Sequence, residues 1–81
     1  MPVIVCIVNI CDLYQKIYIR KNEETQLVTE AETAQLASLL ADIAIINCIN
    51  DIHLLGDKTY LEIIKEELLE YESNLKVYIN E

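Results

Sequence analysis

Residues 3–10 read Val-Ile-Val-Cys-Ile-Val-Asn-Ile, an almost unbroken apolar run rich in β-branched side chains. A continuous run of this kind is typical of a strand that is covered on both faces, whereas a half-exposed strand alternates. Because neighbouring residues of a strand point to opposite sides, both faces of the sheet are predicted to be apolar here. This strand therefore belongs in the middle of a sheet, and the rest of the chain is arranged around it.

Two further strands are predicted before the first helix. Residues 9–15 form a connector, and residues 16–20 alternate between apolar and polar side chains, which indicates a half-exposed strand that pairs with the first. Residues 21–24 are a charged turn. Residues 25–28 are short but are expected to add a third antiparallel strand.

The pattern becomes helical at Thr29, which has the spacing of a capping box with Glu32 and predicts that the helix begins there. Five apolar residues then fall on one helical stripe: Leu36, Leu39, Leu40, Ile43 and Ile46. Asparagines in residues 47–50 end the helix. This helix is apolar around most of its circumference, which suggests a second apolar contact beyond the sheet.

The last part of the chain predicts a strand, a helix and a strand. Residues 52–55 are an inner strand, and the helix that follows Gly56 is capped by either Asp57 or Thr59. Its buried stripe is expected to contain Tyr60, Leu61, Ile64, Leu68 and Tyr71. Residues 76–80 alternate again and predict an edge strand.

The element order is therefore β-β-β-α-β-α-β, which predicts one α/β domain over residues 1–81. Hairpins pair with themselves and strands separated by helices are parallel with right-handed crossovers, so the simplest mixed five-stranded sheet has the spatial order 3-2-1-4-5. Both crossovers then run in the same direction and place both helices on one face. The other face is left uncovered.

An uncovered apolar face predicts self-association, most simply as a twofold homodimer. The residues assigned to self-association at this face are Ile4, Cys6, Val8 and Ile10. Packing of the apolar first helix against its mate is the alternative. A purely structural role, in which the face meets a different chain of a larger assembly, is a further possibility.

The composition excludes several classes of function. Asp and Glu outnumber Lys and Arg by 14 to 6, for a formal net charge of −8, so direct nucleic-acid binding is not expected. No apolar run approaches the roughly 20 residues of a membrane-spanning helix. Three cysteines in apolar stretches, Cys6, Cys11 and Cys48, predict buried free thiols. We expect a protein made without a signal peptide, in a reducing cytoplasm, without a cofactor.

The order of elements resembles the ribonuclease H-like core, which is shared by nucleases, resolvases and actin-like ATPases. In that family the first strand ends with a metal-binding aspartate, and the nearest position here is Asn9. Asp57 lies roughly where a second family acid would sit, and Glu32 or Asp42 could stand in for an acid on the first helix. The glycines that actin-like ATPases use in the first turn are absent from residues 10–13. The resemblance thus implies a shared fold without the family's key carboxylate.

Few residues suggest chemistry. Asp12 and Asp57 are the one pairing that could support two-metal hydrolysis, but roles as a turn acid and a helix cap already explain both residues. His53 lacks partners at metal-ligand spacing, so it is interpreted as an ordinary sheet histidine. The turn at Gly56 could hold an anion at a helix N-terminus, although Asp57 would oppose it. No catalytic or metal-binding residue is therefore assigned.

The strongest charged feature is a run of glutamates on the second helix, called the acidic ridge below. It contains Glu62, Glu66, Glu67, Glu70 and Glu72. Such a run is usually a solvated helix face. Its functional interpretation is that dense negative charge imitates a phosphate backbone and binds a basic groove of another protein.

Small, acidic, glycine-poor chains of this kind also look like accessory proteins of bacteriophages. The sequence therefore predicts a non-enzymatic, homo-oligomeric interaction module, for example a phage-encoded inhibitor that binds a host protein in the host cytoplasm. The alternatives are a degenerate metal-dependent enzyme of the ribonuclease H-like class and a structural subunit.

Overall fold

β1 (Val3–Val8) occupies the middle of a five-stranded sheet, as its continuous apolar sequence predicts. The computed structural model describes residues 1–80. The other strands are β2 (Tyr14–Lys21), β3 (Glu24–Glu32), β4 (Asp51–Gly56) and β5 (Lys76–Asn80). Their order across the sheet is β3-β2-β1-β4-β5, which confirms the predicted topology.

The sheet is mixed. β1 and β2, and β2 and β3, pair antiparallel, whereas β4 pairs parallel to β1 and to β5. The β2–β3 hairpin turns through Asn22 and Glu23, whose φ angles are 52° and 69°. Two positive φ values in a two-residue loop match the strand twist of a tight hairpin. β3 contains a bulge opposite Ile17 and Tyr18, where the pairing register shifts.

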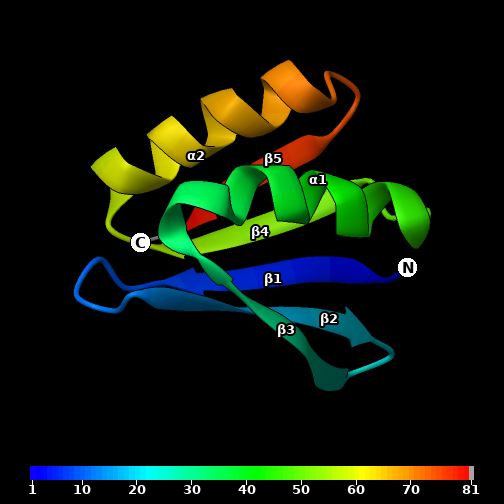
Figure 1. Ribbon diagram of the computed structural model, residues 1–81. Helices are drawn as coiled ribbons and strands as arrows, with labels where there is room; N and C mark the ends of the chain where they lie inside the picture. Colours follow the sequence, from blue (N-terminus) through cyan, green and yellow to red (C-terminus); the bar gives the residue numbers. More distant parts are fainter. Residues whose placement is uncertain (81) are drawn as a thin grey trace.

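Both helices cover the same face of the sheet, as Figure 1 shows. They are α1 (Leu36–Ile46), which follows a short 3₁₀ helix η1 (Thr33–Gln35), and α2 (Lys58–Tyr71). The two crossovers, from β3 to β4 and from β4 to β5, both move towards the β5 edge, so their shared handedness places both helices on one side. The single hydrophobic core therefore lies between the helices and that face.

The helix stripes differ from the predicted ones at their ends. The buried residues of α1 are Leu36, Ala37, Leu40, Ala41, Ile43 and Ala44. Alanines on this side let α1 approach its neighbours closely, while Ile46 is 78% exposed. In α2 the stripe of Leu61, Ile64 and Leu68 is confirmed, but Tyr71, the last residue of the helix, is 62% exposed.

The predicted capping box is wrong. Thr29 and Glu32 both lie in β3, and α1 begins only at Leu36 after Gln35, which makes no side-chain cap. β2 extends back to Tyr14, which pairs with Glu32, so the ladder offers β3 backbone partners along its full length. Those long-range hydrogen bonds replace the local cap, which is why the third strand is longer than its apolar sequence predicts.

The second helix begins as predicted. Asp57 is its N-cap, and its Oδ1 accepts a hydrogen bond from the backbone N–H of Tyr60 at 3.3 Å. Gly56, at the end of β4, has φ of 139°, and a Cβ there would collide with the backbone carbonyl oxygen of Val8. The strand therefore needs glycine at this position, because the chain turns into α2 while β1 passes close by.

A buried glutamine holds the connector between β1 and β2. The side chain of Gln15 is 1% exposed. Its Oε1 accepts from the backbone N–H of Asn9 at 2.9 Å, and its Nε2 donates to the backbone oxygens of Asn9 and Asp12 at 2.9 and 3.0 Å and to Oγ1 of Thr33 at 3.1 Å. One side chain thus satisfies the backbone of a turn that contains no glycine.

Candidate functional site

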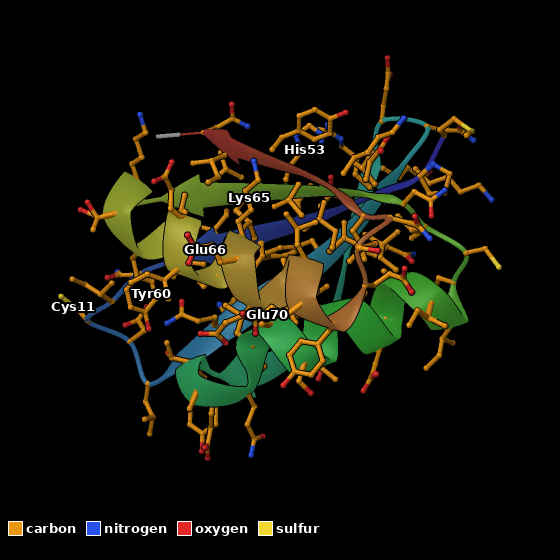
Figure 2. All side chains as sticks on the ribbon, turned by 90° about the horizontal axis from the view of Figure 1, so that it is seen from above. Cys11, His53, Tyr60, Lys65, Glu66 and Glu70 are labelled. Atoms are coloured by element: carbon orange, nitrogen blue, oxygen red, sulfur yellow. The ribbon has the colours of Figure 1, made fainter. Side chains whose placement is uncertain are left out.

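The face of the sheet opposite the helices, called the open face below, is built by every second residue of each strand. Val5 on β1 is paired with Tyr18 on β2 and with His53 on β4, which is in turn paired with Tyr78 on β5. Residues paired in a ladder point to the same side, so these four share one face. Figure 2 shows His53 on the side of the sheet away from α2.

The centre of the open face is apolar. β1 contributes Val3, Val5 and Ile7, and Ile7 is 55% exposed while the two valines are half-buried. Leu55 of β4 and Leu27 of β3 continue this surface to either side, and Leu27 is 52% exposed. An apolar patch that runs across several strands of one face is unusual on an isolated chain, and it marks a candidate binding surface.

His53 and Tyr78 stack on one another within this face. Their ring centroids lie 4.9 Å apart with an interplanar angle of 25°. His53 points away from Ile52 and Leu54, as its position in the strand predicts, because those two residues are fully buried under the helices. The stacked pair gives the open face an aromatic wall at its β5 side.

Charged residues surround this apolar centre. Three of the six basic residues in the chain, Lys16, Arg20 and Lys76, belong to the open face by register. Its acids by the same criterion are Glu30, Glu32 and Asp51. Lys16 lies directly across from Glu30 and Lys76 from Asp51, whereas Arg20 faces Thr25. The open face is thus close to neutral in a chain whose formal charge is −8.

The residues predicted for self-association at the uncovered face, Ile4, Cys6, Val8 and Ile10, are the wrong alternating set. Ile4 and Cys6 are 0% exposed and Val8 is 4% exposed, because all three lie in the core under the helices. Ile10 is exposed, but it lies beyond β1 in the connector to β2. The residues of β1 that a partner can reach on the open face are Val3, Val5 and Ile7.

The three cysteines differ in their surroundings. Burial raises the pKa of the Cys6 thiol from 9.0 to about 12, so this thiol stays protonated and packs as a small apolar group. Cys11 and Cys48 are free and exposed, although both were predicted to be buried. Cys48 has φ of 55°, and it follows α1 in the turn that leads to β4.

The carboxyl ends of β1 and β4 are where the ribonuclease H-like family would place its acids. Oδ1 of Asn9 accepts a hydrogen bond from the backbone N–H of Cys11 at 3.0 Å, which makes it a turn residue. Asp57 caps α2, and Asp12 contributes its backbone oxygen to Gln15. Within residues 1–80, no three His, Cys, Asp or Glu side chains are grouped so that they could hold a metal ion.

An open hollow of about 340 Å³ is bordered by the end of α1 and the segment after α2, away from the open face. Another of about 230 Å³ lies on the open face, bordered by Ile7, Lys16 and Tyr18 and by the connector near Asn9. Ligand pockets are typically about 300–1,000 Å³ and enclose most of the ligand. A shallow hollow of this size within a flat apolar face is better suited to a side chain of a docked protein.

The acidic ridge lies on the other side of the molecule. Glu62, Glu66, Glu67 and Glu70 are exposed, and Glu72 is half-buried with its Oε1 accepting from the backbone N–H of Asn74 at 3.3 Å. Figure 2 shows Glu66 and Glu70 on α2, on the layer opposite His53, with Lys65 on the same helix. The ridge and the open face are therefore separated by the core.

Several residues of this site were missed in the sequence. Tyr18 and Tyr78 lie in the alternating segments 16–20 and 76–80 but were not singled out, and only the register shows that they flank Val5 and His53 in one row. Gln15 was placed at the end of a loop, although it is the one buried polar residue of the described chain. Its neighbours in sequence, Tyr14 and Lys16, are both exposed, which is the alternation of a strand.

The fold and the open face together define an α/β protein of ribonuclease H-like architecture with one uncovered sheet face. Its structure is similar to part of a Bacteroides thetaiotaomicron protein that is described as having an actin-like ATPase fold and unknown function. The TM-score is 0.71 at 19% identity, over 98% of this chain and 32% of the other. The chain thus spans about a third of that protein, and the likeness shows the fold alone.

No protein-family model and no curated protein sequence matches the chain. Among residues 1–80, no helix is both long enough and apolar enough to cross a membrane.

Proposed function

We propose that this protein is a non-enzymatic interaction module that associates with a second copy of itself through the open face. The observation that carries the proposal is that Val3, Val5 and Ile7 of the central strand β1 lie on the face that no helix covers. An apolar centre inside a charged rim is the usual anatomy of a protein–protein interface. The proposal assigns no reaction, because the family's carboxylate position is Asn9 and its side chain serves a turn.

The size of the face supports a dimer. The chain has principal extents of 30 × 25 × 20 Å, so a face bounded by two of them is comparable with the roughly 800 Å² that each partner buries in a standard interface. Burial of Ile and Val side chains supplies a driving force of about 25 cal/mol for each Å² of apolar surface removed from water. Dimerisation would give the second face of β1 the cover that its sequence predicts.

The test is the replacement of Ile7 by Lys. This side chain is more than half exposed in the single chain, so the variant is expected to fold, while a charge at this apolar position of β1 has to be buried on association. Sedimentation equilibrium should show a dimer for the unmodified protein and a monomer for Ile7→Lys.

The matched control is Ile63→Lys, because Ile63 is 52% exposed but lies on α2. This variant should dimerise normally. Circular dichroism has to show the same folded spectrum for both variants. A monomeric unmodified protein at several hundred micromolar, or equal loss of the dimer in both variants, would contradict the proposal.

A second candidate function is the binding of a basic protein by the acidic ridge. It is favoured by the position of the ridge on the layer opposite the open face, which leaves Glu62, Glu66 and Glu70 accessible in the proposed dimer. Capture of a partner that is lost at high salt, and lost in the Glu62→Gln, Glu66→Gln, Glu70→Gln triple variant, would support it. Unchanged affinity in the triple variant would remove the ridge as the binding surface.

A further inference from the structure

The strand register arranges the open face in rows that cross the sheet from β3 to β5. The middle row contains Leu27, Tyr18, Val5, His53 and Tyr78 in that order. It is apolar or aromatic along its full length, although its two halves are not the same: two aromatic rings lie on the β5 side of Val5, and one ring and a leucine lie on the β3 side.

The rows on either side carry the charges. In the row of Val3, Arg20 lies on β2. Asp51 of β4 belongs to the same row, because the next residues of the two strands, Ile4 and Ile52, are paired. In the row of Ile7, Lys16 lies on β2 and Leu55 on β4. The charged residues are therefore distributed asymmetrically, both across the strands and along them. Because of this asymmetry, a twofold axis parallel to β1 and one perpendicular to β1 bring different charges together.

A twofold axis parallel to β1 places each row over the same row of the second copy, with its residues in the reverse order. β2 of one copy therefore lies over β4 of the other. Val5 then meets Val5 of the second copy on the axis, Tyr18 meets His53, and Arg20 meets Asp51. Leu27 packs against the stacked ring of Tyr78, because β3 lies over β5. Each apolar or aromatic residue of the middle row meets another, and a cation meets an anion.

A twofold axis perpendicular to β1 places each strand over the same strand of the second copy, running in the opposite direction. β2 therefore lies over β2 of the other copy. Arg20 then meets Lys16 of the second copy, and the symmetry repeats this contact between like charges at the other end of the interface. Like charges brought together during association suppress a binding mode. The perpendicular arrangement therefore places its basic residues together, where the parallel one pairs a base with an acid.

We infer that the homodimer packs open face on open face about a twofold axis parallel to β1, with Arg20 of each copy against Asp51 of the other and Val5 on the axis. This inference rests on the proposed function and adds which residues set the orientation. Two sheets packed in this way cross at a small angle, about 30°, so the contacts at the axis keep their register. Farther from the axis the crossing angle displaces the two sheets relative to each other, and the long side chain of Arg20 can still reach Asp51 there.

The occupant is a second copy because of the charge of the face. Two chains of net charge −8 repel each other, and the open face, with three bases and three acids by register, adds no net charge to that repulsion. Single-stranded nucleic acid also stacks on aromatic sheet faces. Such a ligand needs an excess of bases, whereas Lys16 and Lys76 each lie across from an acid.

The first experiment exchanges the charges. Arg20→Asp and Asp51→Arg should each raise the dissociation constant of the dimer at least tenfold in sedimentation equilibrium at low salt, because each places two like charges together. The double variant R20D/D51R should recover most of the affinity. Lys21→Asp makes the same change of charge on the opposite side of β2 and should leave the affinity within about twofold, since exposed charges outside the contact contribute little.

The outcomes distinguish an error in the orientation of the twofold axis from an error in the choice of the open face as the interface. Under the perpendicular axis, Arg20→Asp would meet Lys16 and tighten the dimer, which would overturn the inference. If Ile7→Lys abolishes the dimer but the double variant does not recover, the face is right and the axis is wrong. If the unmodified protein is monomeric, or if it binds a fluorescent oligonucleotide through Tyr18 and Tyr78 instead, the proposed function fails with it.

A second experiment places thiols at the axis. In a background with Cys11→Ser and Cys48→Ser, a short bis-maleimide should cross-link Val3→Cys of one copy to Val3→Cys of the other, because the parallel axis runs along β1 and packed sheets lie about 10 Å apart, too far for a direct disulfide. Each thiol adds across one maleimide double bond, so the step needs no oxidant. Tyr18→Cys is the control, because the parallel axis places it against His53 of the second copy, whereas the perpendicular axis places it against its own counterpart. Cross-linking of Tyr18→Cys without Val3→Cys would overturn the parallel axis.

Discussion

The two faces of β1, the central strand, are made from similar residues, but the helices cover only one of them. On the covered face Ile4, Cys6, Ile52 and Leu54 are all 0% exposed, whereas Ile7 on the open face is 55% exposed. In β1 both faces are fully apolar, so the strand itself does not prefer one side. The difference teaches that the crossovers, which carry both helices to one side of the sheet, decide which face of β1 is buried.

The largest expected difference between the faces is found in β4, where two adjacent leucines point to opposite sides. Leu54→Ala should lower the free energy of unfolding by about 2–5 kcal/mol, because it opens a cavity in the closed core. Leu55→Ala should cost less than half as much in urea unfolding of the dilute monomer, since Leu55 is half-exposed. Equal losses would show that the open face is covered within the single chain.

A polar residue gives the next largest effect. Gln15→Met keeps the length of the side chain on the covered side but leaves the backbone N–H and carbonyl of Asn9 without their partner. We expect a loss of about 1–3 kcal/mol in unfolding free energy. Lys16→Met, one residue along on the open face, should change it by less than about 0.5 kcal/mol. A tolerated Gln15→Met would mean that water takes over its hydrogen bonds.

A rise to alkaline pH should lower the free energy of unfolding through Cys6, which lies on the covered face. Because folding raises the pKa of Cys6 from 9.0 to about 12, the folded state keeps a proton that the unfolded chain releases. The stabilisation is complete below pH 9 and is lost as the pH rises towards 12, by up to about 1.4 kcal/mol for each pH unit. Thermal unfolding of Cys6→Ala should show a shallower pH dependence over this range, and Cys11→Ser should follow the unmodified protein.

The smallest effect concerns the aromatic wall of the open face. A double-mutant cycle with His53→Ala and Tyr78→Ala should give a coupling energy of about 0.5–1 kcal/mol in urea unfolding, the usual range for a stacked pair. The single variants should also weaken the dimer, because both rings belong to the middle row. Zero coupling would indicate that the two rings move independently on the surface.

Much of the fold could be predicted because it follows from local patterns and general rules. The continuous run in β1, the alternation of residues 16–20 and 76–80 and the right-handed crossovers lead to the observed strand order. The capping box at Thr29 failed because pairing with β2 supplied hydrogen bonds from far along the chain. The open face was misassigned for a related reason: β1 is apolar on both sides, so its own alternation says nothing about which side is covered.

A signal for the open face was nevertheless present in the neighbouring strands. Lys16, Tyr18 and Arg20 mark the more polar side of β2, and Tyr78 marks that of β5. These residues identify Val3, Val5 and Ile7 as their neighbours only when the register is known. A slip by one residue would have exchanged the faces, which is why this signal could not be used without the structure.

The sequence by itself determined the number and order of the strands and the presence of helices on one face only, because these depend on local periodicity and on the chirality of the chain. Only the tertiary structure decided which residues of β1 face outwards, where β3 ends, and which side chains share a row with His53. These depend on hydrogen-bonded pairing between segments distant in sequence, and the free energy of each pairing is set by the whole sheet.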